Sequence, residues 1–366
     1  MRRLLALALA LVIAPTLTQA AGKPAANSLA APCISATATC EQWVALGDSG
    51  ARSMVYATYP LTAPNTRIRR ALIMVHGTGR NADHYFTTAT GAAFLADALG
   101  DTLVISPAFH SADGGCKDKL QPKEVSWSCG GDSWRSGGMS ASNPELSSFD
   151  LIDQLLKTLA DKHTFPNLTA IVVAGHSAGG QFVHRYEMAN RVHETLGVPV
   201  SYVVANPSSY AWPDATRALP DGDGAPAAEV AGWDKETPHT NFSYGPLANA
   251  AAVPKYDLWP FGLEARTRGY TVQMSDAQLK LQLISRPTTY LLSQVDTLPL
   301  GGFDGSPPAM AQGATRRSRG EAFVKFINEH LGAKAKVIIV PECGHNDRCV
   351  YTTDAVLPVI FPPVAP

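Results

Sequence analysis

The sequence has little charge and no excess of either sign. Its 366 residues carry 30 Lys and Arg against 31 Asp and Glu, and charged residues make up 17% of the chain. Nucleic-acid partners require a basic face, so this balance argues against them. The charged fraction lies below the roughly 25% typical of soluble domains. Apolar residues reach an ordinary 45%, which excludes a disordered chain.

Apolar runs long enough to span a bilayer are absent. Residues 4–14 form the longest such run, which is too short for a spanning helix of ~20 residues. It follows a basic start, Arg2 and Arg3, and precedes small residues that end at Ala20. This order predicts a signal peptide at residues 1–20 and a secreted or periplasmic protein without stable membrane insertion. The short run disfavours the alternative, an uncleaved anchor.

The six cysteines show no C-x-x-C redox spacing and no zinc-ligand pattern. In an exported protein an even number of cysteines usually forms disulfides. Their spacing favours three local pairs, Cys33–Cys40, Cys116–Cys129 and Cys343–Cys349. We therefore expect three disulfides and no metal site.

Internal repeats are also absent, and the chain instead alternates apolar runs with helical patterns. Strands are predicted at residues 54–59, 71–75, 102–106, 170–174, 201–205, 288–293 and 335–340. Helices are predicted at residues 83–99, 149–160, 181–196 and 316–331. This order predicts an α/β fold with a mostly parallel, doubly wound sheet and helices on both faces.

One stretch interrupts the alternation. Residues 206–285 contain much Pro and Gly, scattered aromatics and little periodicity, which is long for a loop in a compact domain. We expect a cap-like insertion over the carboxyl edge of the sheet, where ligands bind in such folds. A decorative insertion with its own small core is the alternative. We expect residues 21–49 to form a leader that contains a disulfide. Residues 50–366 are expected to form one catalytic domain, which includes this insertion.

Residues 175–179 read Gly-His-Ser-Ala-Gly, directly after a buried strand and before a helix. A nucleophile elbow holds its serine in a strained turn, so the flanking residues must be small. Gly175 and Gly179 meet that need. The pattern predicts Ser177 as a nucleophile and the Ala178 N–H as a donor to an oxyanion.

A catalytic serine requires a base and an acid, which this type of fold supplies in the order serine, acid, histidine. His345 follows the last predicted strand and Asp296 follows the strand before it. We expect His345 as the base and Asp296 as the residue that orients it. Asp304 is the alternative acid, whereas Asp150 and Asp153 precede the serine and fit the order poorly.

A second oxyanion donor is expected after the early buried strand, in residues 76–81. The Thr78 N–H is the candidate, with Gly79 or Arg80 as alternatives. The segment lacks the G-x-x-x-x-G-K-[ST] pattern of a phosphate-binding loop. His76 and His176 are expected to be structural.

On these residues the chain resembles the α/β-hydrolase superfamily over residues 50–360. The resemblance rests on the elbow, the turn at His76, and the order Ser177, Asp296, His345. Residues 75–82 are also similar to the oxyanion segment of secreted esterases and polyester depolymerases. The long insertion and the cysteine set depart from the compact depolymerases.

The sequence therefore predicts a secreted serine hydrolase that cleaves small or polymeric carboxylic esters through an acyl-enzyme, without a cofactor. Three alternatives stay open: a peptidase or amidase on the same triad, a non-catalytic binding protein, and a lipase acting at interfaces. Oligomeric state is not indicated. Tryptophans in two regions are candidates for substrate contact or for core packing: Trp127, Trp134, Trp212, Trp233 and Trp259.

Overall fold

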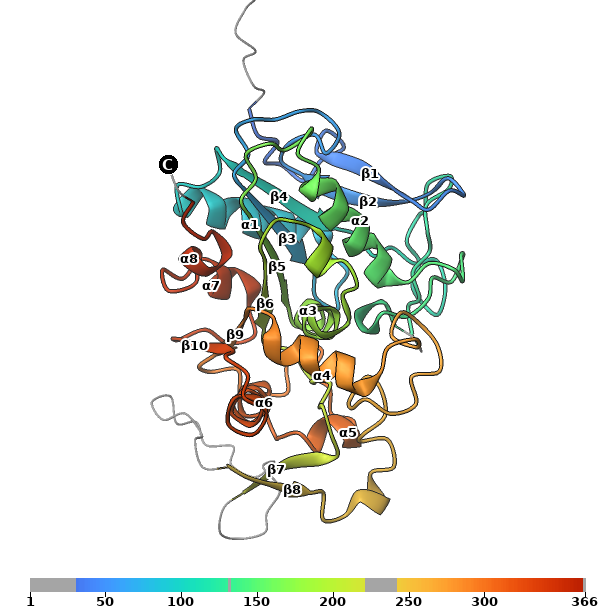
Figure 1. The fold of residues 1–366 in the computed structure, drawn as a ribbon, viewed down its shortest axis with the longest axis vertical. Coiled ribbons are helices and arrows are strands. Elements are labelled where there is room, and N and C mark those ends of the chain that lie inside the picture. Colours follow the sequence, from blue (N-terminus) through green and yellow to red (C-terminus); the bar gives the residue numbers. More distant parts are fainter. Residues whose placement is uncertain (1–30, 131–132, 221–241, 365–366) are drawn as a thin grey trace, which may run out of the picture. The chain divides into compact units, whose positions relative to one another are not determined.

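Eight strands form the central sheet of the computed structural model, which describes residues 31–130, 133–220 and 242–364 (Figure 1). The predicted signal peptide, part of the leader and Trp233 lie outside these ranges. In sheet order the strands are β1 (Glu41–Leu46), β2 (Ala51–Ala57), β4 (Thr102–Pro107), β3 (Arg70–Val75), β5 (Ala170–His176), β6 (Val200–Ala205), β9 (Thr288–Ser293) and β10 (Lys336–Val340). The strands from β4 to β10 are parallel, and β1 and β2 add an antiparallel edge. The predicted α/β fold with a mostly parallel sheet is confirmed.

Helices cover both faces of this sheet. They are α1 (Ala82–Leu95), α2 (Ser148–Ala160), α3 (Ala178–Ala189), α4 (Asp276–Ser285), α5 (Pro307–Met310), α6 (Arg316–Leu331), α7 (Asp347–Tyr351) and α8 (Leu357–Ile360). A capping box formed by Ser147 and Asp150 begins α2. Side chains of α2, α3 and α6 share one apolar cluster, whereas those of α1, α7 and α8 share another.

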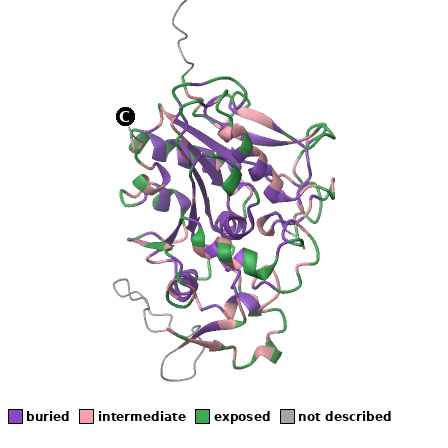
Figure 2. Cartoon of the chain, viewed as in Figure 1, coloured by how far each residue is buried: buried purple, intermediate pink, exposed green. Residues whose placement is uncertain are grey.

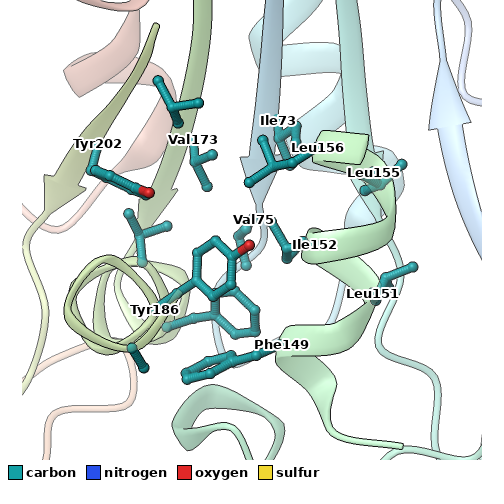
Figure 3. Packing of buried hydrophobic residues seen from close by; sticks show 14 of the residues in the cluster. Ile73, Val75, Phe149, Leu151, Ile152, Leu155, Leu156, Val173, Tyr186 and Tyr202 are labelled. Atoms are coloured by element: carbon teal, nitrogen blue, oxygen red, sulfur yellow. The ribbon is translucent and has the colours of Figure 1, made fainter. Parts of the chain in front are cut away.

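The alternation of side chains along β3 explains why its sequence is apolar throughout. Ile73 and Val75 face the α2 and α3 side of the sheet (Figure 3), whereas Leu72 and Met74 face the α1 side. Both sets are buried, as the central strands are in Figure 2. A strand covered on both faces needs no polar positions.

Several elements differ from the sequence expectation. The helix α1 ends at Leu95 rather than at residue 99, and β2 spans Ala51–Ala57 rather than residues 54–59. The strand β1 was not predicted, because Glu41 and Gln42 begin it and it lies at a sheet edge. The predicted helix over residues 181–196 begins earlier, at Ala178, and ends at Ala189. The Asn190 side chain accepts hydrogen bonds from the N–H groups of Val192 and His193, which turns the chain away from the helix.

The stretch at residues 206–285 contains a separate antiparallel pair, β7 (Thr216–Pro220) and β8 (Phe242–Pro246), and the helix α4. Its residues 221–241 lie outside the described ranges. Several of its side chains join the main core rather than a core of their own, among them Tyr210, Trp212, Leu263 and Tyr270. Its role as a cap stays a prediction.

Strand register places the loops that carry the candidate site at one edge. Val75 is paired with Gly175, so β3 and β5 end side by side. The same edge carries the ends of β9 and β10, where Ser293 is paired with Val340. Beyond these strands the Val295 N–H donates to the Cys343 carbonyl at 3.0 Å. The turns after all four strands therefore meet at the carboxyl edge of the sheet.

Candidate active site

Ser177 occupies a strained turn between β5 and α3. Its backbone has φ 60° and ψ −119°, which is unusual for any residue other than glycine. The residues on either side of the turn must be glycine, because backbone atoms leave no room for a side chain there. A Cβ on Gly175 would lie 2.3 Å from the Gly179 carbonyl oxygen, and one on Gly179 would lie 2.2 Å from the Val75 oxygen. The local sequence thus permits a turn that few other residues could form.

The structure brings Ser177, His345 and Asp296 into a hydrogen-bonded chain. The Ser177 Oγ lies 2.9 Å from Nε2 of His345, and Nδ1 of the same ring lies 2.8 Å from Oδ2 of Asp296. An ionised carboxylate only accepts, so Nδ1–H donates to Asp296 and Nε2 is left to accept from the serine. This is the tautomer that a general base needs.

The alternative acids make other contacts. Asp304 accepts a hydrogen bond from the Ser306 N–H, and Asp150 accepts from Ser147 at the start of α2. Asp153 accepts from two tyrosine hydroxyls on the α2 and α3 side of the sheet. Among the described carboxylates only Asp296 bonds His345, as the sequence order favoured.

The turn after β3 lies against the serine. A Cβ on Gly77 would come within 3.6 Å of the Ser177 Cβ. The Arg80 N–H donates to the Gly77 carbonyl within this turn at 3.1 Å, which removes Arg80 from the candidate oxyanion donors. Thr78 is exposed at the turn, and Ala178 begins α3. Their N–H groups as oxyanion donors stay a prediction.

Two further histidines near the serine are buried. The His76 Nε2 accepts from the Phe109 N–H, while Nδ1 lies 2.9 Å from the Gly77 carbonyl, and burial lowers its pKa to about 3. The His176 ring lies 4.6 Å from the His345 ring, centre to centre. Burial, followed by the charges of His345 and Arg316, lowers the pKa of His176 well below its usual value. Both are therefore neutral and serve packing and orientation.

Arg316 contacts Asp296, and the sequence did not predict this contact. Its Nη1 donates to Oδ1 of Asp296 at 3.2 Å, and its side chain is 1% exposed. A signal was available at the start of α6, where Arg316, Arg317 and Arg319 crowd the first turn. Cations are unfavourable at a helix N-terminus, so three of them there indicate partners elsewhere.

The sulfur atoms of each predicted cysteine pair are bonded in the structure: Cys33–Cys40, Cys116–Cys129 and Cys343–Cys349. The last pair brackets His345. Together with the Asn346 side chain, which accepts from the Cys349 N–H, it shapes the turn that carries the imidazole. The described residues contain no group of three or more His, Cys, Asp or Glu that could hold a metal ion.

Most of the tryptophans in the described residues pack in the protein core. Trp127 and Trp212 are fully buried, and Trp134 stacks on Phe109 with ring centres 4.9 Å apart. Trp259 is half-buried and donates from Nε1 to the Ser136 carbonyl. The sequence left open whether these side chains contact substrate or pack in the core. Core packing describes Trp127, Trp134 and Trp212.

A serine on a strained turn between a parallel strand and a helix, at the carboxyl edge of a doubly wound sheet, is the arrangement of α/β hydrolases. The chain belongs to the alpha/beta hydrolase family, whose model matches residues 72–357. No curated protein matches the chain.

Solved structures share this fold at low identity. Poly(aspartic acid) hydrolase-1 from Sphingomonas sp. KT-1 is 22% identical, with a TM-score of 0.57, over 88% of this chain and 98% of that one. LpqC, a poly(3-hydroxybutyrate) depolymerase from Bordetella parapertussis, is 18% identical, with a TM-score of 0.54, over 85% of this chain and 88% of that one. These likenesses show the fold alone.

Proposed function

We propose that this hydrolase cleaves carboxylic esters through an acyl-enzyme formed on Ser177. The observation that carries the proposal is the continuous pair of hydrogen bonds from Ser177 through His345 to Asp296, at 2.9 and 2.8 Å. Each bond lies within the range expected of a nucleophile, its base and the group that orients the base.

The reaction has two halves. Ser177 Oγ attacks the ester carbonyl carbon while its proton moves to Nε2 of His345. The N–H groups of Ala178 and Thr78 stabilise the oxyanion, and Asp296 stabilises the imidazolium. His345 then gives the proton to the departing alkoxide, which leaves an acyl-serine. Water, deprotonated by His345, releases the acid and restores the serine.

The proposal extends to compartment and domain plan. Three disulfides are typical of an extracellular or periplasmic protein, and residues 1–20 are its proposed signal peptide. Within the described residues no helix is both long and apolar enough to cross a membrane. Residues 50–366 form the proposed catalytic domain, with residues 206–285 as its cap.

A fluorophosphonate probe tests the nucleophile directly. The wild-type protein should be labelled on Ser177 and should hydrolyse p-nitrophenyl esters. Ser177→Ala should lose the label and lower kcat by about 1,000-fold or more. Ser201→Ala on β6 is the matched control and should keep both. A Ser177→Ala protein that is labelled and active refutes the assignment.

A substrate panel separates the remaining classes. Esters of increasing acyl length and an insoluble polyester are compared with peptide amides, since the same triad serves both bond types. Faster cleavage of amides would make the protein an amidase or peptidase. Activation only above the critical micelle concentration would indicate a lipase, and absent labelling a binding protein.

A further inference from the structure

We propose that Arg316 is a positioning residue that fixes the carboxylate of Asp296 and holds the segment around Gly301 against His345. The inference rests on the proposed function, because it assigns Arg316 a task toward the acid and the base of that mechanism. It concerns a side chain on α6 that no sequence motif marks.

Four hydrogen bonds fix the guanidinium of Arg316. Its Nη1 bonds Asp296, Nε donates to the Ser208 Oγ at 2.7 Å, and Nη2 donates to the carbonyl oxygens of Leu300 and Gly301 at 2.8 and 3.0 Å. The Phe303 ring lies against it, 5.2 Å from Cζ to the ring centre. One buried side chain thus joins α6, the loop after β6 and the loop after β9.

The two oxygens of the Asp296 carboxylate have separate partners. Oδ2 accepts from His345 and Oδ1 accepts from Arg316. A carboxylate with one bound oxygen can rotate about its Cβ–Cγ bond, but a carboxylate bound at both is held in one plane. Arg316 thereby keeps Oδ2 directed at the imidazole.

Arg316 also holds the loop that covers the imidazole. Gly301 has φ +58°, and a Cβ there would lie 2.8 Å from Cδ2 of His345. The next residue, Gly302, has φ +70°, and a Cβ there would lie 2.8 Å from Cγ2 of Thr78. The loop therefore packs closely on the candidate base and beside the candidate oxyanion turn. Two of the hydrogen bonds of Arg316 anchor its carbonyls.

The charge of Arg316 acts within a small set of neighbours. His345 and His176 lie on the side of Asp296, and Asp304 lies in the covering loop. Arg319 lies on α6 itself, and Tyr210 packs against that helix. Burial lowers the pKa of Arg316 and the charge of Asp296 opposes that shift, so the guanidinium remains a cation. It offsets part of the attraction that Asp296 exerts on a protonated His345. Without it, the repulsion between the guanidinium and the protonated imidazole is lost.

Arg319 provides a matched control on the same helix. It lies one turn further along α6 and bonds the carbonyls of Ser208 and Asp304, and the Phe303 ring lies 4.4 Å from its Cζ. It supports the same two loops, but among the described residues it makes no hydrogen bond to Asp296. A purely structural role for Arg316 predicts the same phenotype for both arginines.

The test compares Arg316→Met, Arg316→Lys and Arg319→Met by the pH dependence of kcat/KM on a p-nitrophenyl ester. We expect Arg316→Met to lower kcat by about 10–100-fold, with KM changed less than about threefold. The acid limb of its profile should move up by about half a pH unit or more. Arg316→Lys keeps the charge but not the four bonds, so kcat should fall with the limb unmoved. Arg319→Met should leave the limb unmoved.

Two results would overturn the inference. One is a pH profile of Arg316→Met whose acid limb lies where the wild-type limb lies, or whose acid limb moves no further than that of Arg319→Met. The other is Arg316→Lys with kcat within about twofold of wild type, which decides the matter alone if Arg316→Met does not fold. Fluorophosphonate labelling of the wild-type protein keeps the two proposals apart. A labelled, active wild type with unaffected arginine variants refutes only the role of Arg316.

Discussion

At the scale of single residues, the space around Ser177 is set by backbone atoms. A Cβ at Gly179 would meet the carbonyl oxygens of Val75 and His76 at 2.2 and 2.7 Å. Backbone in the middle of a sheet cannot move aside as a flexible side chain can. The strained serine and its glycines therefore form one unit.

Gly179→Ala should consequently disrupt the elbow. We expect a loss of about 3 kcal/mol in the free energy of unfolding, the upper range for overpacking, and no measurable esterase activity. Urea unfolding and p-nitrophenyl ester hydrolysis measure the two effects. Gly91→Ala is the control, since nothing lies within 4 Å of its Cβ position in α1, and it should stabilise by roughly 0.5–1 kcal/mol. Wild-type stability in Gly179→Ala would contradict this account.

The candidate triad was predictable because each of its residues follows a recognisable strand. Parallel strands end at one edge, so Ser177, Asp296 and His345 had to converge there. Arg316 was not predictable in the same way. It reaches the acid from the first turn of α6, through burial that no short motif encodes.

At the scale of elements, the turn between β10 and α7 carries His345 within the Cys343–Cys349 disulfide. A second disulfide, Cys33–Cys40, closes a loop of nearly equal length, with separations of 6 and 7 residues. It precedes β1, at the opposite edge of the sheet from β10. The two disulfides therefore restrict the unfolded chain to a similar extent, but only Cys343–Cys349 lies next to the candidate site.

Removing either disulfide should cost similar stability but different activity. Each double Cys→Ser variant should lose roughly 2–3 kcal/mol on the chain-entropy model. We expect kcat to fall about tenfold or more only when Cys343 and Cys349 are replaced, because only that change frees the imidazole turn. Thermal melting and ester hydrolysis at 25 °C make the comparison. Equal loss of activity in both variants would show that the turn needs no covalent clamp.

Element types were easier to predict than their ends. The buried strands β3 and β5 follow from unbroken apolar runs, and α6 was predicted at its observed bounds. The early end of α3 was missed because it depends on the Asn190 side chain, which competes with the helix for backbone N–H groups. The edge strand β1 begins with two polar residues, Glu41 and Gln42, and the apolar run that follows them is too short to stand out.

At the scale of the whole molecule, the stretch at residues 206–285 is tied into the main core. Tyr270 donates its hydroxyl proton to Oδ2 of Asp153 on α2 at 2.6 Å and accepts from the Arg191 N–H at 3.0 Å. Tyr186 of α3 donates to the other oxygen of Asp153, also at 2.6 Å. The sequence could not predict this link, since it joins residues more than a hundred positions apart.

Tyr270→Phe should therefore weaken the attachment of this stretch, and more strongly at neutral than at acidic pH. Burial raises the pKa of Asp153, while the two tyrosine hydroxyls lower it. A raised pKa means that the folded state binds more protons than the unfolded state, so stability falls as pH rises through that window. Loss of one donor raises the pKa of Asp153 further and widens the window.

We expect Tyr270→Phe to cost about 1–3 kcal/mol at pH 7.5, and less near pH 4.5, where Asp153 is more often protonated. Urea unfolding at both values measures the difference. Tyr256→Phe is the control, because within the described ranges its hydroxyl has no hydrogen-bond partner, and its cost should stay within about 0.5 kcal/mol. A cost for Tyr270→Phe that does not change with pH would mean that the hydroxyl acts by packing or through Arg191, and that the charge of Asp153 does not govern this attachment.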